Sequence, residues 1–137
     1  MAIQQRGIIA RFFDLIDGVA EGDPVDILAE DFQFEMVFPG IGGPPDERIS
    51  GNKEDFRQFM HKLQTRPEGP PARATATARR HNIQTLELVD GVEFMLGKAL
   101  GGRRQGTILA AAQADEEGKM TRYVVVMSSV EFTAGKA

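Results

Sequence analysis

The sequence predicts one α+β domain in which helices come first and a run of strands comes last. Three observations support this prediction. Apolar residues recur at helical spacing over residues 3–19. Large apolar residues then alternate with their neighbours over residues 32–38, which is the two-residue period of a strand. Beyond residue 79 the pattern is that of strand and turn, with Asp90-Gly91 as the strongest hairpin signal.

Three helices are expected before the strands. The first covers residues 3–19, and its buried side holds Ile8, Phe12, Leu15 and Val19. The second, over residues 24–30, is short, because Asp23 suits its N-cap and Pro24 its first helical position. The third begins at Asn52, has Asp55 as its cap partner, and ends near residue 63.

Loops and turns separate the remaining elements. Residues 39–45 hold three glycines and three prolines, so a loop is expected there. A proline-rich connector over residues 66–78 leads from the third helix toward four strands. Turns are expected at Asp90-Gly91, at Gly101-Gly102 and over residues 115–118. The predicted order is therefore helix, helix, strand, helix and a four-stranded meander.

Composition narrows the classes of function. The 137 residues are 42% hydrophobic and 26% charged, an ordinary balance for one globular domain. A net charge of −4 argues against a nucleic-acid partner, and the lack of cysteine excludes disulfides and thiolate chemistry. No apolar run approaches the length of a membrane span, and residues 1–10 lack the pattern of a secretory signal. We expect a cytoplasmic protein that binds neither membrane nor nucleic acid.

Two segments carry a resemblance to a known family: AEDFQFEMVFPG at residues 29–40 and ERISGNKEDFRQFM at residues 47–60. Together they resemble the nuclear transport factor 2-like (NTF2-like) superfamily, and within it the SnoaL-like group. The superfamily includes ketosteroid isomerase, limonene epoxide hydrolase and polyketide cyclases. The resemblance covers residues 1–137 as a single domain.

This resemblance implies a cone-shaped, curved sheet of mixed or antiparallel strands wrapped around a pocket. Three N-terminal helices would close the pocket, and the protein would be a homodimer. No particular reaction is implied, because this scaffold supports unrelated chemistries as well as plain binding.

Pairing across the predicted turns assigns residues to the two faces of the sheet. Residues that flank a turn pair directly, and paired residues share a face. This arithmetic places Ala110 opposite both Glu93 and Tyr123, on a face rich in glycine and alanine that is expected to line the pocket. The other face mixes apolar with charged residues, which suits an outer face covered by a second subunit. An odd-length loop or a bulge would break the assignment.

At the positions where the family has its catalytic residues, this chain has residues that cannot transfer a proton. By resemblance, the carboxylate base of ketosteroid isomerase falls at Met36, and the acid that donates to the oxyanion falls near Ala110. The tyrosine of the first helix becomes Phe12 or Phe13. The water-positioning residues of epoxide hydrolase fall at Phe34 and Met36, and the final strand has no aspartate. The usual machinery is therefore missing.

Glu93 and Tyr123 remain as candidate catalytic residues. A carboxylate beside a phenol in an apolar cavity can act as base and acid, with burial raising the pKa of the carboxyl group. The alternative is structural. In that case Glu93 lies in water at the rim of the sheet, and Tyr123 packs with its hydroxyl on one partner.

A set of apolar side chains is expected to line the pocket on its helix and strand sides. The set is Phe12, Phe34, Met36, Phe38, Phe59, Met95, Ala110, Val125 and Met127. Methionines adapt to irregular ligands. The same residues would serve equally as an ordinary core.

The two histidines and the acidic side of the first helix give weaker candidates. His61 is expected on the solvent side of the third helix. His81 is expected to be exposed at a strand start, with a position facing a cleft as the alternative. Asp14 shares its side of the first helix with Arg11 and Asp17, so a surface ion pair is expected there. No spaced set of ligands predicts a metal site, and no cofactor is expected.

These observations predict a protein that binds a small hydrophobic molecule, polycyclic or terpenoid by resemblance. If it is an enzyme, cofactor-free acid/base isomerisation, cyclisation or hydration is expected. The alternative is a module without catalysis, either a ligand carrier or a dimerising protein-interaction domain.

Overall fold

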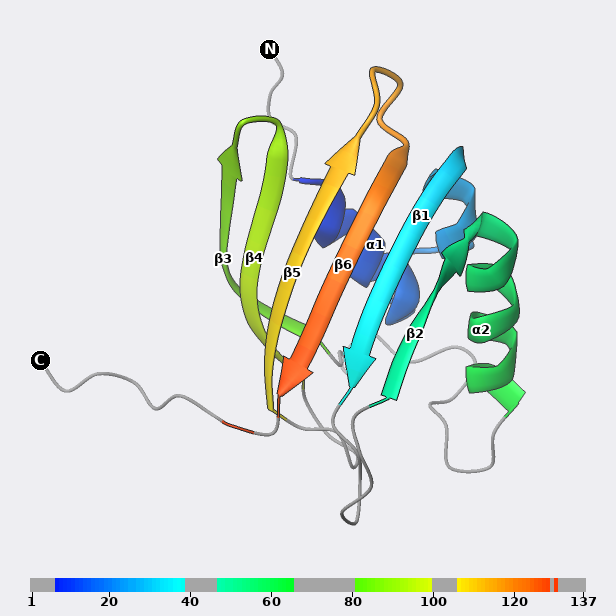
Figure 1. Cartoon of the computed structure of the whole chain (residues 1–137), viewed down its shortest axis with the longest axis horizontal. Coiled ribbons are helices and arrows are strands. Elements are labelled where there is room, and N and C mark those ends of the chain that lie inside the picture. The colour runs from blue at the N-terminus through cyan, green and yellow to red at the C-terminus, as the bar shows by residue number, and fades with distance from the viewer. Residues whose placement is uncertain (1–6, 39–46, 66–80, 100–105, 129, 131–137) are drawn as a thin grey trace, which may run out of the picture.

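A computed structural model describes residues 7–38, 47–65, 81–99, 106–128 and 130 of the chain. These residues form one six-stranded sheet with helices packed on one of its sides (Figure 1). The elements in chain order are α1 (Ile8–Ile16), the short 3-10 helix η1 (Pro24–Ile27), β1 (Leu28–Phe38), β2 (Glu47–Asn52), α2 (Lys53–Thr65), β3 (His81–Val89), β4 (Val92–Ala99), β5 (Gly106–Ala114) and β6 (Met120–Ser128).

The strands lie in the order β2-β1-β6-β5-β4-β3. The central β1 and β6 are parallel, and the other neighbouring pairs are antiparallel, so the sheet is mixed. Helix α1 packs on β4 and β5, and α2 packs on β1 and β2. The α+β class and the mixed sheet agree with the prediction.

Two α-helices and one 3-10 helix stand in the described residues where three helices were predicted. Helix α1 ends at Ile16, and the predicted residues before Gly7 lie outside the described part. The second helix starts as expected, since Asp23 Oδ1 accepts a hydrogen bond from Val25 N at 2.9 Å. It does not reach residue 30, because Leu28 already pairs with Met120 of β6 and begins β1.

The predicted start of α2 is confirmed in detail. Asp55 Oδ2 accepts a hydrogen bond from Asn52 N at 2.9 Å, and Asn52 Oδ1 accepts one from Asp55 N at 3.0 Å. This reciprocal pair satisfies two backbone donors that a helix N-terminus otherwise leaves without partners.

Strand β2 was not predicted. Its sequence holds one large apolar residue, Ile49, and no alternating pattern, so nothing local marks it as a strand. It forms as an edge strand because β1 offers it a partner, with Ile49 opposite Met36. The predicted loop at residues 39–45, the connector at residues 66–78 and the turn at Gly101-Gly102 lie outside the described residues.

The hairpin between β3 and β4 turns at Asp90-Gly91, as predicted. Asp90 and Gly91 have φ angles of 53° and 78°, the left-handed pair that a two-residue hairpin turn requires. Leu88 pairs with Glu93 as expected. Further along, a bulge places Ile83 opposite Gly97, where Gln84 was expected.

The next two strand pairs are offset by two residues from the predicted register. Ala110 pairs with Met95 and with Val125, and Ala112 is the residue that lies between Glu93 and Tyr123. Because side chains alternate with a period of two, an even offset moves the rows but leaves the residues on their predicted faces as far as the bulge at Gln113/Ala114.

Phenylalanine rings join the two helices to the sheet. Phe12 of α1 lies 5.5 Å from Phe56 of α2 and 4.9 Å from Tyr123 of β6, measured between ring centroids. Phe56 also meets Phe32 of β1 at 5.9 Å. Both helices therefore cover the same side of the sheet, which we call the inner face. Neither helix of the described part is long and apolar enough to cross a bilayer.

Candidate functional site

The residues predicted to line a pocket all lie in one hydrophobic cluster under the helices. Those that are buried are Phe12, Phe34, Met36, Met95, Ala110 and Val125, and those that are partly buried are Phe38, Phe59 and Met127. Helix α1 lies over β4 and β5, the strands that carry the small residues. The structure thus brings the predicted set together, and the rings of Phe38 in β1 and Phe59 in α2 stack within it.

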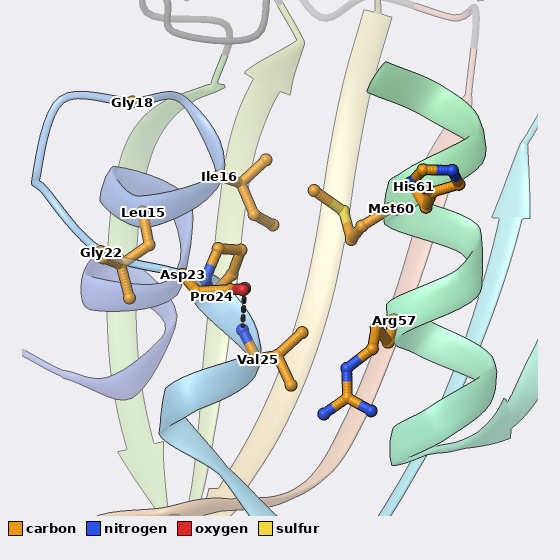
Figure 2. Close-up of a pocket in the computed structure, with 10 residues that line it drawn as sticks. All are labelled: Leu15, Ile16, Gly18, Gly22, Asp23, Pro24, Val25, Arg57, Met60 and His61. Carbon is orange, nitrogen blue, oxygen red and sulfur yellow. Dashed lines mark hydrogen bonds between the residues drawn. The ribbon is translucent and has the colours of Figure 1, made fainter. Parts of the chain in front are cut away.

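A cleft of about 520 Å³ lies beside this cluster, between the α1–η1 segment and α2 (Figure 2). It is lined by Leu15, Ile16, Gly18, Gly22, Asp23, Pro24, Val25, Arg57, Met60 and His61. Ile16 and Met60 also pack against the hydrophobic cluster, so the cleft adjoins the inner face of the sheet. None of the predicted pocket residues lines it.

The walls of the cleft differ in character. Apolar side chains of α1 and η1 face Met60 of α2 across the opening, as Figure 2 shows. Arg57 and His61 stand on the α2 wall with Met60, and Arg57 forms an ion pair with Glu54 one turn earlier. His61 is exposed, as predicted, and it also lines this opening. The cleft therefore offers a ligand both apolar and polar contacts, with Arg57 and His61 on the α2 side.

Glu93 has a partner that its position in the sequence did not reveal. Its Oε1 accepts a hydrogen bond at 2.8 Å from Ile9 N in the first turn of α1. The N-cap residue Gly7 makes no side-chain hydrogen bond, and a Cβ at that position would overlap the Glu93 carboxylate. Glu93 therefore caps α1 from the sheet, and glycine at position 7 gives it room. Burial raises the pKa of Glu93, and the hydrogen bond from Ile9 lowers it by less.

Glu93→Gln should change how stability depends on pH. The raised pKa means that the folded state favours the protonated carboxyl group, so this contribution is complete below the ordinary value of 4.5. It is lost as the pH rises through the folded-state pKa. Glutamine cannot ionise and still accepts from Ile9 N, so the variant should gain stability relative to wild type as pH rises above 4.5. Urea unfolding at a series of pH values measures the difference.

The control for this measurement is Glu87→Gln, an exposed glutamate on the neighbouring β3. Its stability should follow that of wild type across the same pH series. A constant difference between Glu93→Gln and wild type would contradict the assigned burial of this carboxyl group.

Tyr123 lies in the core, with its ring edge-on to Phe12. Burial raises the pKa of its phenol, so the hydroxyl stays protonated. Within the described residues this hydroxyl makes no hydrogen bond, either to Glu93 or to any other group. A buried hydroxyl without a protein partner is free to bind an oxygen or nitrogen atom of a ligand or water. The two residues flank Ala112, but no hydrogen bond joins them.

Asp17 and His81 form a pair that the sequence did not predict. Asp17, expected on the surface, is buried at the C-terminal end of α1. Its Oδ1 lies 2.7 Å from His81 Nδ1, and its Oδ2 accepts a hydrogen bond from His81 N at 3.1 Å. The His81 ring stacks on Phe13, with centroids 4.3 Å apart. The expectation of an exposed His81 is therefore wrong, because the end of α1 meets the start of β3.

A metal site is not found in the described residues, since no three histidine, aspartate or glutamate side chains gather there. The local pairs above are therefore hydrogen-bonded groups within the protein. Each of the two carboxylates, Glu93 and Asp17, ties one end of α1 to the sheet.

Comparison with known proteins identifies the architecture. No family model and no curated protein matches the sequence. A candidate ketosteroid isomerase from Kribbella flavida DSM 17836 is similar in structure, with a TM-score of 0.59 at 16% identity over 94% of this chain and 81% of that chain. An NTF-2 like protein of unknown function from Burkholderia xenovorans LB400 has a TM-score of 0.57 at 14% identity over 93% and 84% of the two chains. The chain has an NTF2-like fold.

The NTF2-like fold agrees with the fold that the resemblance implied, while membership of the superfamily and of its SnoaL-like group stays a prediction. A de novo designed protein with a curved β-sheet is also similar, with a TM-score of 0.54 at 13% identity over 91% of this chain and 88% of that chain. At such identities the comparisons establish how the chain folds, and the chemistry has to be argued from the site.

Proposed function

We propose that this protein binds a small apolar molecule, which enters through the cleft between α1 and α2 and lies toward the inner face of the sheet. The observation that carries the proposal is the cleft itself, about 520 Å³ in volume and walled by Leu15, Ile16, Pro24, Val25 and Met60. Ligand sites are typically concave and of this size. A cone-shaped pocket of the SnoaL-like type is part of the same proposal.

Binding is better supported than catalysis at the positions where the family carries its acid and base. Met36 and Ala110 occupy those positions, and both are buried apolar residues of the core. The alternative pair has no mutual hydrogen bond, and Glu93 already accepts one from Ile9. Catalysis by Glu93 and Tyr123 remains the second candidate, because Tyr123 offers a buried hydroxyl that no described group satisfies. It predicts that Tyr123→Phe abolishes turnover but spares ligand binding.

The cleft can be tested by filling it. Met60→Trp replaces a thioether side chain on the α2 wall by a bulky indole ring. The variant should therefore abolish stabilisation by an apolar ligand. The probes are androstenedione, chosen because one structural neighbour is named for ketosteroids, and limonene as a terpenoid. For wild type, a ligand at about a hundred times its dissociation constant should stabilise by about 2.7 kcal/mol, measured by thermal unfolding.

Gln58→Trp is the matched control, since it adds the same ring at an exposed position of α2 outside the cleft. Its ligand-induced stabilisation should equal that of wild type. Equal stabilisation of the Met60 and Gln58 variants would remove the cleft from the proposal. No stabilisation of wild type by either probe would favour the protein-interaction alternative.

We also propose that two copies pair through the outer face of the sheet, the face away from the helices. Phe94, Leu109, Val124 and Val126 are between 39% and 54% exposed there, and the register places them on adjacent strands. A contiguous apolar patch of this kind marks an interaction surface. Leu109→Lys should therefore convert a dimer to a monomer in analytical ultracentrifugation. Leu88→Lys, at the exposed tip of β3, should leave the dimer intact.

A further inference from the structure

The pair formed by Asp17 and His81 is more buried and makes more contacts than an ordinary surface ion pair. The Asp17 side chain is 0% exposed, and both of its carboxylate oxygens are directed at His81, one at the ring and one at the backbone N–H. Burying a carboxylate is costly unless its hydrogen bonds are made. Phe13 covers one face of the imidazole and fixes its plane. The ring is thus held in one orientation from two sides.

This geometry also determines which nitrogen of His81 is available. A carboxylate accepts hydrogen bonds, so Nδ1 carries the proton that lies between the ring and Asp17. In the neutral ring, Nε2 then carries the lone pair. Among the described residues no group bonds to Nε2, and the side chain is 21% exposed. An imidazole oriented by a carboxylate through Nδ1, in a side chain that is partly exposed, has the arrangement of a general base.

We propose that His81 is a catalytic general base, that Asp17 is its positioning residue, and that the substrate is a small molecule with an acidic C–H proton. The C–H bond breaks and the proton moves to Nε2, while its electron pair stays with the substrate. The Asp17 carboxylate stabilises the resulting imidazolium, which then returns the proton to water or to the product. The inference stands apart from the cleft, because His81 is not among the residues that line it.

A purely structural pair would explain part of this geometry. The hydrogen bond from His81 N to Asp17 ties β3 to the end of α1 whatever side chain residue 81 carries. That bond does not require an imidazole, nor does it require Nε2 to be accessible. A measurement that depends on the imidazole ring itself therefore distinguishes a structural role of His81 from a catalytic one.

The first measurement needs no variant that disturbs the fold. The nitrogen NMR spectrum of the neutral imidazoles should show the His81 ring protonated at Nδ1 only, because Asp17 accepts the hydrogen bond there. The chain contains two histidines, so His61→Gln assigns the signals. A ring protonated at Nε2, or at both nitrogens, would overturn the proposal.

The second measurement uses nitrobenzisoxazole as the probe. A base removes the ring C–H proton, the electron pair forms the nitrile, the N–O bond breaks, and a coloured cyanonitrophenolate is released. Wild type should exceed free imidazole at equal concentration by at least about tenfold, since Asp17 orients the His81 ring and stabilises the imidazolium that forms. His81→Gln should lose roughly a hundredfold, the lower end of what general-base catalysis contributes.

The control is Glu87→Gln, an exposed position on the same strand as His81, which should retain the wild-type rate. Asp17→Asn should lower kcat by at least about tenfold with little change in KM, together with loss of the single Nδ1-protonated state in the NMR spectrum. The proposal is overturned if wild type is no faster than imidazole, or if His81→Gln turns over the probe like wild type.

Discussion

Phe12→Ala is expected to lower the free energy of unfolding by about 3–5 kcal/mol, the usual cost of deleting a large aromatic side chain from a core. The Phe12 side chain is completely buried. Its ring contacts Phe56 of α2 and Tyr123 of β6, so truncation opens a cavity where α1, α2 and the sheet meet. Urea unfolding followed by circular dichroism measures the loss.

Leu88→Ala is the control for this change, because Leu88 is 73% exposed near the tip of the β3–β4 hairpin. Its effect should stay within about 0.5 kcal/mol. If Phe12→Ala costs less than about 1 kcal/mol, Phe12 is the wall of a hollow rather than part of a filled core. The same experiment therefore distinguishes the two roles that the sequence left open for this residue.

The parts of the fold that were predicted correctly are those that a periodic or local pattern in the sequence determines. The stripe of Ile8, Phe12 and Leu15 specifies α1, because neighbours three or four residues apart share one side of a helix. Asn52 and Asp55 specify the start of α2 through two hydrogen bonds within four residues. The predicted inner and outer faces of β4 and β5 are correct despite an error in the register, since an offset of two residues preserves the alternation of side chains.

The parts that escaped prediction depend on partners distant in the chain. Strand β2 has little pattern of its own and is ordered by pairing with β1. Glu93 reaches Ile9 across 84 positions, and Asp17 reaches His81 across 64. On a helical projection Asp17 shares the polar side with Arg11, but that projection does not show that β3 covers the last turn of α1.

The position of the cleft also depends on segments distant in the chain, so the sequence pattern did not predict it. Small residues on β4 and β5 suggested a hollow above them, and α1 lies over those strands. The opening appears instead where the connector between α1 and η1 leaves a gap beside α2. Gly18 and Gly22 of that connector adopt positive φ angles of 76° and 132°, which lets the chain bend away from α2. Two glycines so spaced after a helix are the one local signal that marked this bend.

Asp17→Ala should cost about 3 kcal/mol of stability, since it removes two hydrogen bonds to a buried carboxylate, each worth about 1.5–3 kcal/mol, while relieving the cost of burying that charge. It also leaves His81 N without its acceptor at the junction of α1 and β3. Asp14→Ala, one turn earlier on α1 and partly exposed, should cost less than about 1 kcal/mol. Denaturant unfolding of both variants makes the comparison.

A double-mutant cycle with His81→Gln divides the effect between the two bonds. In that background the ring contact is already gone, so Asp17→Ala should cost less than in wild type by at least about 0.5 kcal/mol. The remaining cost includes the bond from the backbone N–H of residue 81, which any side chain at this position retains. If Asp17→Ala were as mild as Asp14→Ala, the carboxylate would not be holding α1 to β3. If the two changes were strictly additive, the imidazole and the carboxylate would not be coupled.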